Sequence, residues 1–514
     1  MIEAKHFQRT NGLNCAEYVI SGVARYLKRD FELMYIGAWG YDLDYTKSIF
    51  ETGFLSDHAS NAQKYLEEFH GIQIRHFQFS DYRDFEALVH HELAEDRPVM
   101  VTVDLFWVPW TTQNYLKIKW EHEMLIVGKN NEGWLCYDYF NSEANVMPFD
   151  HMEKCFHFAR TFRVLPEKQI NYLTCIRELK KNIIQNIIET DAFNKLAYFG
   201  EKLLDPEALF CEQMNTMAEI VSFQKTDLME TINRLSQTRS QYALMLRFIA
   251  EHADQYKQLM YIAEKFEYTA AIWKSIWGMM QKAYMIKEKK AIIARVGNKI
   301  KDVAQIEKEI CDLLLNIEDC HIISVNEDVE AGYHALKQRQ IPLDEIANHK
   351  GIDRMVLPIR ATFQSGFLVA DTTLQKGDII CNDTKYRICS LEQQYDNVAC
   401  VGQDIPINMS CTAVSVLCCA EFAHQIEELS IHGKNNVYSF PFCVTSWGWS
   451  KPEFKQTIAW EGSEGILSGT EIRTYPLPRH IYHKTYYFAQ EINVEMIRLP
   501  YCPNIHIFGI TVHY

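Results

Sequence analysis

The stretch EHEMLIVGKNNEGWLCYD, residues 121–138, decides how the N-terminal part of the chain folds. Its two apolar runs, EMLIVG and GWLCYD, predict β-strands, and the polar residues between them predict a hairpin turn. His122 stands at the start of the first strand and Asp138 at the end of the second. Because antiparallel neighbours place such side chains near each other, we expect His122 and Asp138 to meet.

A second stretch, NCAEYVISGVARYLKRD at residues 14–30, predicts a helix with Cys15 in its first turn. Cys15, Val19, Val23 and Tyr26 recur at a spacing near four, which places them on one helix face. Backbone N–H groups and the dipole at a helix N-terminus favour a thiolate, and the N–H of the cysteine can help to hold an oxyanion. The alternative interpretation is a small buried residue on an amphipathic helix.

The order of these residues indicates a nucleophilic site. A cysteine nucleophile needs a base that works near neutral pH, and the base needs an acceptor that orients it. Cys15, His122 and Asp138 follow one another on a helix, a strand and a strand. This is the order found in papain-like cysteine peptidases, so the three residues are our candidate catalytic triad.

The polar side chains before Cys15 are candidates for the oxyanion donor. Papain-like enzymes usually place a Gln several residues before the nucleophile, and Gln8 is the nearest one here. Asn11 and Asn14 are closer to Cys15, and the sequence does not choose among the three. Loop polarity and helix capping explain Gln8 and Asn11 equally well.

Together with VDLFWVPWTTQNYLKIKW at residues 103–120, these stretches resemble the N-terminal family of the butirosin biosynthesis protein BtrH. That family is similar to bacteriocin-processing, papain-like cysteine peptidases. The family has a Cys at the start of a helix, which matches Cys15, and a Pro-aromatic pair, which matches Pro109 and Trp110. It also has a His before an apolar strand and an Asp at the end of the next strand, which match His122 and Asp138. The resemblance covers roughly the first 165 residues.

This resemblance implies acyl transfer. The butirosin protein moves an aminoacyl group from an acyl carrier protein to an amine of an aminoglycoside, and a similar enzyme of closthioamide assembly joins thioester-bound acyl chains to a diamine. By this likeness Cys15 takes an acyl or peptidyl group from a phosphopantetheine thioester, His122 deprotonates the thiol and later the amine, and Asp138 orients His122. The implied partners are a carrier protein and a small amine, without a cofactor or a metal ion. Trp107 and Trp110 are candidates for the wall of a narrow cleft that slows attack by water.

Three regions differ in their patterns, and they predict an α+β chain with three domains. Residues 1–166 mix helices and strands and form the papain-like catalytic domain. Residues 167–350 form a helical domain, since no proline occurs between Pro206 and Pro342 and apolar stripes recur at helical spacing. Residues 351–514 form a β-sandwich or jelly roll, since short apolar runs alternate with turn residues there. Within this last region the run FLVADTTLQKGDIICN, residues 367–382, is expected to be a strand.

Composition excludes several classes of protein. The chain of 514 residues carries a formal charge of −15, which argues against a nucleic-acid binder because such proteins need a basic face. The fifteen cysteines are irregularly spaced and form no CxxC pair, so they predict free thiols and a cytoplasmic location. The N-terminus has no signal-peptide pattern and no apolar run is long enough to span a membrane.

Other conspicuous side chains have plain explanations. We expect His70, His90 and His91 on the exposed faces of helices, and Asp104 at the end of a buried strand where it can line the cleft. Three tryptophans of the C-terminal region either stack on sugars or fill the core. They are Trp447, Trp449 and Trp460.

The sequence leaves three functions open. The first is an acyltransferase that forms an amide from a carrier-bound thioester in a pathway like that of nonribosomal peptides. The second is a cysteine peptidase or amidase with the same triad, in which water replaces the amine. The third is an inactive peptidase fold that serves as a scaffold. Substitution of Cys15 separates the third from the other two, and the nature of the product separates the first from the second.

Overall fold

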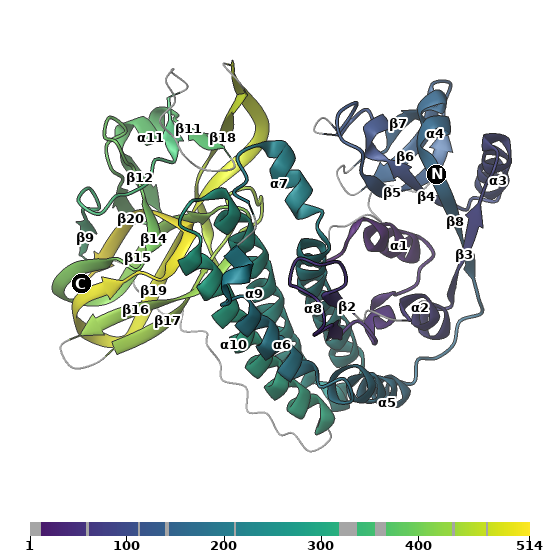
Figure 1. The fold of residues 1–514 in the computed structure, drawn as a ribbon, viewed down its shortest axis with the longest axis horizontal. Coiled ribbons are helices and arrows are strands. Elements are labelled where there is room, and N and C mark those ends of the chain that lie inside the picture. Colours follow the sequence, from purple (N-terminus) through teal and green to yellow (C-terminus); the bar gives the residue numbers. More distant parts are fainter. Residues whose placement is uncertain are drawn as a thin grey trace.

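The structure, a computed structural model, has a mixed α/β N-terminal part, helices in the middle and a C-terminal β-sandwich (Figure 1). The helical part lies between the two β-containing parts (Figure 1). The structure describes residues 12–57, 61–111, 114–138, 143–209, 212–317, 337–354, 366–433, 437–468 and 471–514. Among these residues, no helix combines the length and the hydropathy that a membrane span requires.

The N-terminal part is built on a six-stranded antiparallel sheet with the order β3-β8-β4-β5-β6-β7. The predicted hairpin at residues 121–138 is present as β5 and β6. A shorter two-stranded sheet precedes it, made of β1 and β2. The strands are β1 (Tyr41–Leu43), β2 (Leu55–Asp57), β3 (Ile72–Gln78), β4 (Val99–Asp104), β5 (Glu121–Lys129), β6 (Gly133–Asp138), β7 (Asn145–Pro148) and β8 (Phe156–Val164).

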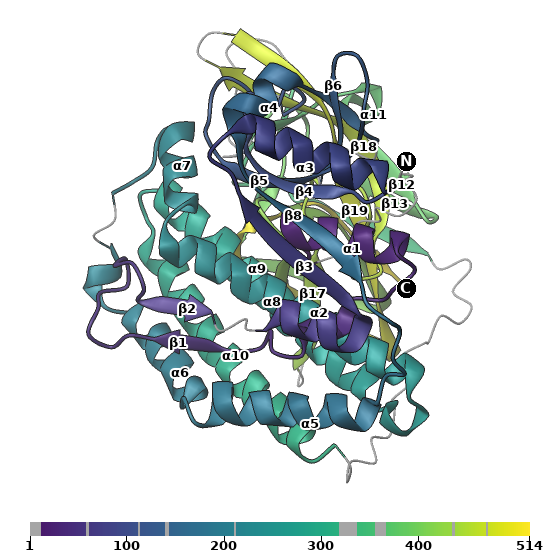
Figure 2. The ribbon, with the colours of Figure 1, turned by 90° about the vertical axis from the view of Figure 1, so that its right-hand side faces the viewer.

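Helices cover both faces of this sheet. Successive residues of β5 point to opposite faces and accordingly belong to two different cores. Leu125 and Val127 belong to the core that contains the buried side of α1 and α2. Met124 and Ile126 belong to a second core with α3 and α4. Figure 2 shows α3 in front of the sheet and α8 behind it. The helices are α1 (Cys15–Tyr26), α2 (Ala62–His70), α3 (Tyr82–Ala94) and α4 (Phe149–Cys155).

The middle part consists of helices that share one continuous core with α1 and α2. Three of them are 26 or 27 residues long and pack side by side. The helices are α5 (Tyr172–Ile183), α6 (Ala192–Lys202), α7 (Met217–Gln224), α8 (Asp227–His252), α9 (Leu259–Met285) and α10 (Lys290–Leu315).

A buried ion pair joins the N-terminal part to these helices. Arg239 of α8 and Glu307 of α10 are both fully buried, and two hydrogen bonds of 2.8 and 2.9 Å link them. The indole N–H of Trp39, in the segment between α1 and β1, donates to the same carboxylate at 2.9 Å. The Glu307 carboxylate therefore ties three distant segments into one core.

The C-terminal part contains a ten-stranded sheet. Its main path runs β10-β11-β18-β19-β15-β20-β14, with β16 paired to β19, β17 paired to β16, and β9 paired to β20. A separate two-stranded sheet consists of β12 and β13. The strands of the C-terminal part are β9 (Gln338–Ile341), β10 (Ile352–Asp353), β11 (Phe367–Val369), β12 (Asp378–Cys381), β13 (Thr384–Arg387), β14 (Val398–Val401), β15 (Asp404–Ala420), β16 (Gln425–Gly433), β17 (Val437–Val444), β18 (Thr457–Ser468), β19 (Glu471–Arg498) and β20 (Tyr501–His513).

Two of the sequence-based expectations were wrong in detail. The run 367–382 is not one strand, because Asp371 caps a short helix, α11 (Thr372–Lys376), which ends at Gly377 in the left-handed conformation. His70 is not on the surface. It is 5 % exposed, and its Nε2 accepts a hydrogen bond from the backbone N–H of Leu33 at 3.0 Å. Burial lowers the pKa of His70 to about 3, so it is a neutral core residue.

The tryptophans of the C-terminal part are mainly core residues. Trp447 and Trp460 are buried in the sandwich core, at 3 % and 5 % exposure. Trp449 is partly exposed and packs edge-on against His424. For Trp447 and Trp460, the interpretation as core residues is confirmed.

Candidate functional site

Cys15 is the first residue of α1, where a capping box fixes the helix start. The Asn14 side chain accepts from the Glu17 N–H at 3.0 Å, and the Glu17 carboxylate accepts from the Asn14 N–H at 2.9 Å. The capping box leaves the N–H groups of Cys15 and Ala16 directed at the Cys15 sulfur, where they favour its thiolate form.

Asn14 thus has a structural role as the helix cap. Its Oδ1 is engaged by Glu17, so its Nδ2 amide hydrogens are the part that could donate to an oxyanion. Gln8 and Asn11, the other two candidates for the oxyanion donor, lie outside the described residues.

The sulfur of Cys15 lies against the start of β5. The backbone N–H of Glu123, the residue after His122, also hydrogen-bonds to the sulfur. Cys15 therefore lies beside Glu123, whereas the His122 side chain points to the opposite face of the sheet, which it shares with Met124 and Asp138. Burial is the main influence on the thiol and raises its pKa above the ordinary value of 9, and the nearby Glu123 carboxylate raises it further.

The raised pKa corrects the expectation that the helix N-terminus yields a thiolate at rest. The N–H groups of Glu123, Ala16 and Cys15 itself act in the expected direction, but the loss of hydration outweighs them. At neutral pH the resting group is a thiol, and its proton must leave when it attacks.

His122 and Asp138 meet as predicted. His122 Nε2 lies 3.9 Å from Asp138 Oδ2, and the side chains are 5 % and 0 % exposed. Asp138 of β6 pairs with Met124 of β5, so their side chains share one face of the sheet. His122 lies two residues before Met124 on β5, so its side chain is on the same face. Burial lowers the pKa of His122 to about 4, while Asp138 acts in the opposite direction. The imidazole is therefore neutral near pH 7 and can accept a proton.

Trp110 belongs to this group, whereas Trp107 does not. The indole N–H of Trp110 donates to Asp138 Oδ2 at 2.6 Å. Trp107, in the 3₁₀ turn η3 (Leu105–Trp107), instead faces α4, where its carbonyl contacts His151 Nδ1 at 3.0 Å and Lys154 lies over its ring. The sequence proposed both rings as cleft walls, and the structure shows that Trp110 is a hydrogen-bond donor to the Asp138 carboxylate.

The segment that carries Trp110 is anchored by Asp104. The Asp104 carboxylate accepts from the N–H groups of Phe106 and Trp120, each at 3.0 Å. It thereby joins the beginning and the end of the segment between β4 and β5. Asp104 therefore fixes both ends of the segment that carries Trp110, and both hydrogen bonds are accepted by its Oδ1.

Sequence reasoning did not find the polar cluster around Glu123. Glu123 Oε1 accepts from the Thr102 hydroxyl at 2.8 Å and lies 2.8 Å from the guanidinium of Arg160. These residues belong to β5, β4 and β8, so the cluster depends on the strand order of the sheet. Glu121 and Glu123 flank His122 in the sequence, but only the structure shows that Glu123 is buried and Glu121 exposed.

A carboxylate also holds α1 against α8. The amide of Gln241 donates to Glu17 at 2.6 Å and to the carbonyl of Gly12 at 3.0 Å. Burial raises the pKa of Glu17 to about 7. The start of the Cys15 helix therefore rests on a group that titrates near neutral pH.

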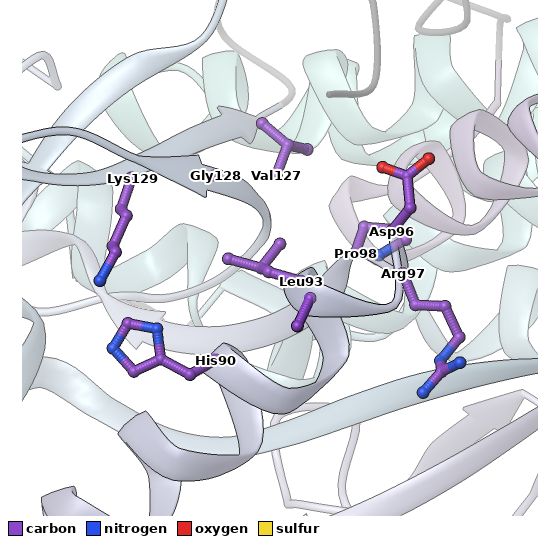
Figure 3. Close-up of a pocket in the computed structure, with 9 residues that line it drawn as sticks. His90, Leu93, Asp96, Arg97, Pro98, Val127, Gly128 and Lys129 are labelled. Carbon is purple, nitrogen blue, oxygen red and sulfur yellow. The ribbon is translucent and has the colours of Figure 1, made fainter.

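The hollow drawn in Figure 3 lies at the other end of β5 from His122. This cavity of about 340 Å³ is lined by the end of α3 and by Val127, Gly128 and Lys129. Asp96 and Arg97 lie on the opposite side of the cavity from His90 (Figure 3). In the described ranges, no group of three His, Cys, Asp or Glu side chains is placed to hold a metal ion.

Two family models match parts of the chain. Residues 28–138 match the family described as butirosin biosynthesis protein H, N-terminal, and residues 361–514 match the AziU2-like beta-sandwich domain. The predicted resemblance to the BtrH N-terminal family is confirmed, with a matched range that contains His122 and ends at Asp138 but begins after Cys15. Among curated proteins, none matches the chain. The two matches fit an enzyme of natural-product biosynthesis.

Proposed function

We propose that this protein is a cysteine-dependent acyltransferase that moves an acyl or peptidyl group from a carrier-protein thioester to an amine in natural-product biosynthesis. The observation that carries the proposal is the placement of Cys15. It begins a helix, its sulfur lies against the strand residue next to His122, and His122 faces the buried Asp138. A helix that presents a cysteine to two antiparallel strands with a His and an Asp also supports a papain-like N-terminal fold.

The reaction has two acyl transfers. In the first, His122 takes the proton of the Cys15 thiol, the sulfur attacks the donor carbonyl, and the carbon–sulfur bond to the carrier breaks. The carrier thiolate leaves with the proton from His122. In the second, the amine nitrogen attacks the acyl-Cys15 thioester, the bond to Cys15 breaks, and the proton lost by nitrogen passes through His122 to the sulfur. The products are an amide, the carrier thiol and the Cys15 thiol.

The N–H groups of Cys15 and Ala16 stabilise the negative charge on oxygen in each tetrahedral intermediate. Asp138 orients the imidazole and stabilises it when it is protonated. Trp110 in turn holds Asp138, through the 2.6 Å hydrogen bond. The neutral resting pair fits this cycle, because burial disfavours both the thiolate and the imidazolium until the substrate is bound.

A basic and apolar surface beside the site fits the carrier protein. Leu116 and Trp120 are 53 % and 38 % exposed, and Lys117 and Lys119 are exposed beside them. Lys225 of the helical part lies over the Trp120 ring at 4.4 Å and donates to the Lys119 carbonyl at 2.8 Å. The chain as a whole carries a charge of −15, but Lys117 and Lys119 lie five and three residues before His122, and Lys225 stacks on Trp120. These three lysines favour an acidic partner. The exposed Glu121 is the acid of this surface.

The decisive experiment is intact-protein mass spectrometry after incubation with an acyl carrier protein but no amine. We expect an acyl adduct that maps to Cys15 and that turns into amide when an amine is added. Product formed at the wild-type rate by Cys15→Ala would refute the mechanism. Free acid as the product with every amine would instead identify a peptidase or amidase.

The carrier surface has its own test. Lys119→Glu should raise KM for the carrier-bound donor several-fold and leave KM for a small thioester of N-acetylcysteamine unchanged. Equal changes for both donors would mean that Lys119 does not contact the carrier.

A further inference from the structure

Glu123 has one carboxylate oxygen that is bonded and one that is not. The residue is 9 % exposed, and its Oε1 meets the Thr102 hydroxyl and the Arg160 guanidinium, each at 2.8 Å. Its Oε2 is buried and has no hydrogen-bond partner among the described residues. A buried carboxylate oxygen without a donor costs free energy, so native proteins seldom keep one without a use.

The position of this oxygen is as informative as its lack of a donor. The backbone N–H of the same residue bonds to the Cys15 sulfur, and the carboxylate is close enough to raise the pKa of that thiol. His122 precedes it on β5. The open carboxylate oxygen thus belongs to the residue whose backbone N–H contacts the atom that carries the acyl group in the proposed reaction.

We propose that Glu123 binds the acceptor amine, with an N–H of the amine on Oε2 while its nitrogen attacks the acyl-Cys15 thioester. This inference rests on the proposed acyltransferase function and names the residue that selects its second substrate. The acceptor is then a primary or secondary amine, since a tertiary amine has no N–H to place on the carboxylate. Glu123 is a binding residue, and His122 remains the base.

The surroundings show why a carboxylate suits this position. The Arg160 guanidinium, on β8, lies on the Oε1 side of Glu123 and leaves Oε2 open. Other titratable groups near this carboxylate include the Cys15 thiol and His76 on β3, whose pKa is lowered by burial. A carboxylate oxygen accepts N–H bonds more strongly than a neutral carbonyl does.

The variant Glu123→Gln is a precise probe of this geometry. The Thr102 hydroxyl donates to Oε1 and the Arg160 guanidinium lies 2.8 Å from it, so the amide oxygen of Gln stays there and its NH₂ group replaces Oε2. The change converts an acceptor into a donor at the amine position and keeps the backbone N–H to Cys15. It also removes the charge that raises the pKa of Cys15, so alkylation of Cys15 should become faster.

The first measurement needs no acyl donor. Iodoacetamide labelling of Cys15 at pH 8, followed by peptide mapping, is timed with n-butylamine and with n-butanol. In wild-type protein butylamine should slow the labelling and butanol should not. Glu123→Gln should label faster and lose the protection by butylamine. Equal protection by both compounds, or protection that survives in Glu123→Gln, would overturn the inference.

The second measurement follows the acyl-Cys15 adduct. With butylamine present, the ratio of amide to free acid should fall about ten- to a hundredfold in Glu123→Gln, since a charged hydrogen bond to the amine is lost. Glu132→Gln, which changes an exposed acid in the turn between β5 and β6, is the matched control and should keep the wild-type ratio. An unchanged ratio in Glu123→Gln refutes the role of Glu123 and leaves the acyltransferase standing. Absence of any adduct in wild-type protein refutes the acyltransferase, and the labelling experiment still decides whether Glu123 binds amines.

Discussion

Glu307 in the helical core and Glu123 beside Cys15 are both buried carboxylates that face an arginine, but their remaining contacts differ. Arg239 bonds both oxygens of Glu307, and the indoles of Trp39 and Trp273 also point at the carboxylate. Glu123 has its contacts on Oε1, and Oε2 has no donor in the described part of the chain.

We infer from this difference that Glu307 stabilises the fold, whereas Glu123 is available to bind a substrate. A buried ion pair whose oxygens are all bonded joins segments that are far apart in the sequence, here Trp39, α8 and α10. A carboxylate with an open oxygen contributes less to the fold than its burial costs. Two further buried acids lie near the site: burial raises the pKa of Glu17 to about 7, and Asp138 accepts the indole N–H of Trp110.

The largest effect is expected from removing the nucleophile. Cys15→Ala should abolish both the acyl adduct and the product, and Cys15→Ser should fail almost as severely because a serine hydroxyl is a weaker nucleophile. The free energy of unfolding should change by about 1 kcal/mol or less, since a half-buried small side chain is lost. Mass spectrometry and urea unfolding measure the two effects. A large loss of stability with intact activity would make Cys15 a core residue.

The next largest effect tests the two carboxylates directly. Glu307→Gln should lower the free energy of unfolding by about 3–5 kcal/mol, because it leaves the fully buried Arg239 without its counter-charge. Glu123→Gln should lower it by about 1 kcal/mol or less, because Oε2 has no donor to lose. Urea unfolding of both variants provides the measurement. Equal losses would remove the distinction on which the comparison rests.

Sequence alone predicted the elements that depend on neighbours in the chain. The helix start at Cys15 follows from Asn14 and Glu17 three residues apart, and the β5–β6 hairpin follows from two apolar runs around a polar turn. The meeting of His122 and Asp138 follows from that hairpin. The helical middle part and the strand-rich C-terminal part were equally visible in the spacing of apolar and turn residues.

What the sequence did not reveal depends on contacts between distant segments. The Glu123–Arg160 pair needs β4 and β8 to be placed beside each other, and the Trp110–Asp138 bond needs the segment after β4 to fold back. The raised pKa of Cys15 follows from burial by the assembled protein, which local motif rules for a helix N-terminus do not include. His70 became a core residue for the same reason.

A smaller effect is expected from the pH dependence of Glu17. Its pKa is about 7 in the folded protein and near the ordinary 4.5 when unfolded, so the folded state binds more protons between these values. Stability from this group is therefore present below about pH 4.5 and is lost as the pH rises to about 7, by up to about 3 kcal/mol. Urea unfolding at pH 5, 6, 7 and 8 should show this loss as a difference between wild type and Glu17→Gln. The lowered pKa of His70 acts in the opposite direction, but it is common to both proteins and cancels. Parallel curves for the two proteins would mean that Glu17 does not titrate in this range.

The smallest effect comes from the same substitution made on both sides of the comparison. Trp39 and Trp110 each donate an indole N–H to a buried carboxylate, at 2.9 Å to Glu307 and at 2.6 Å to Asp138. A change to Phe removes the donor and keeps most of the ring. Trp39→Phe should lower the free energy of unfolding by about 1–2 kcal/mol and leave kcat unchanged, because Glu307 holds the fold.

Trp110→Phe should lower kcat about tenfold, because Asp138 loses the bond that positions it against His122. It should also raise the lower pKa of the pH–rate profile, since a less stabilised carboxylate favours the imidazolium. Trp107→Phe, in the same segment but turned toward α4, should leave both the rate and the pH profile unchanged. If Trp107→Phe and Trp110→Phe slow the reaction equally, the segment acts as a whole and Trp110 has no particular role at Asp138.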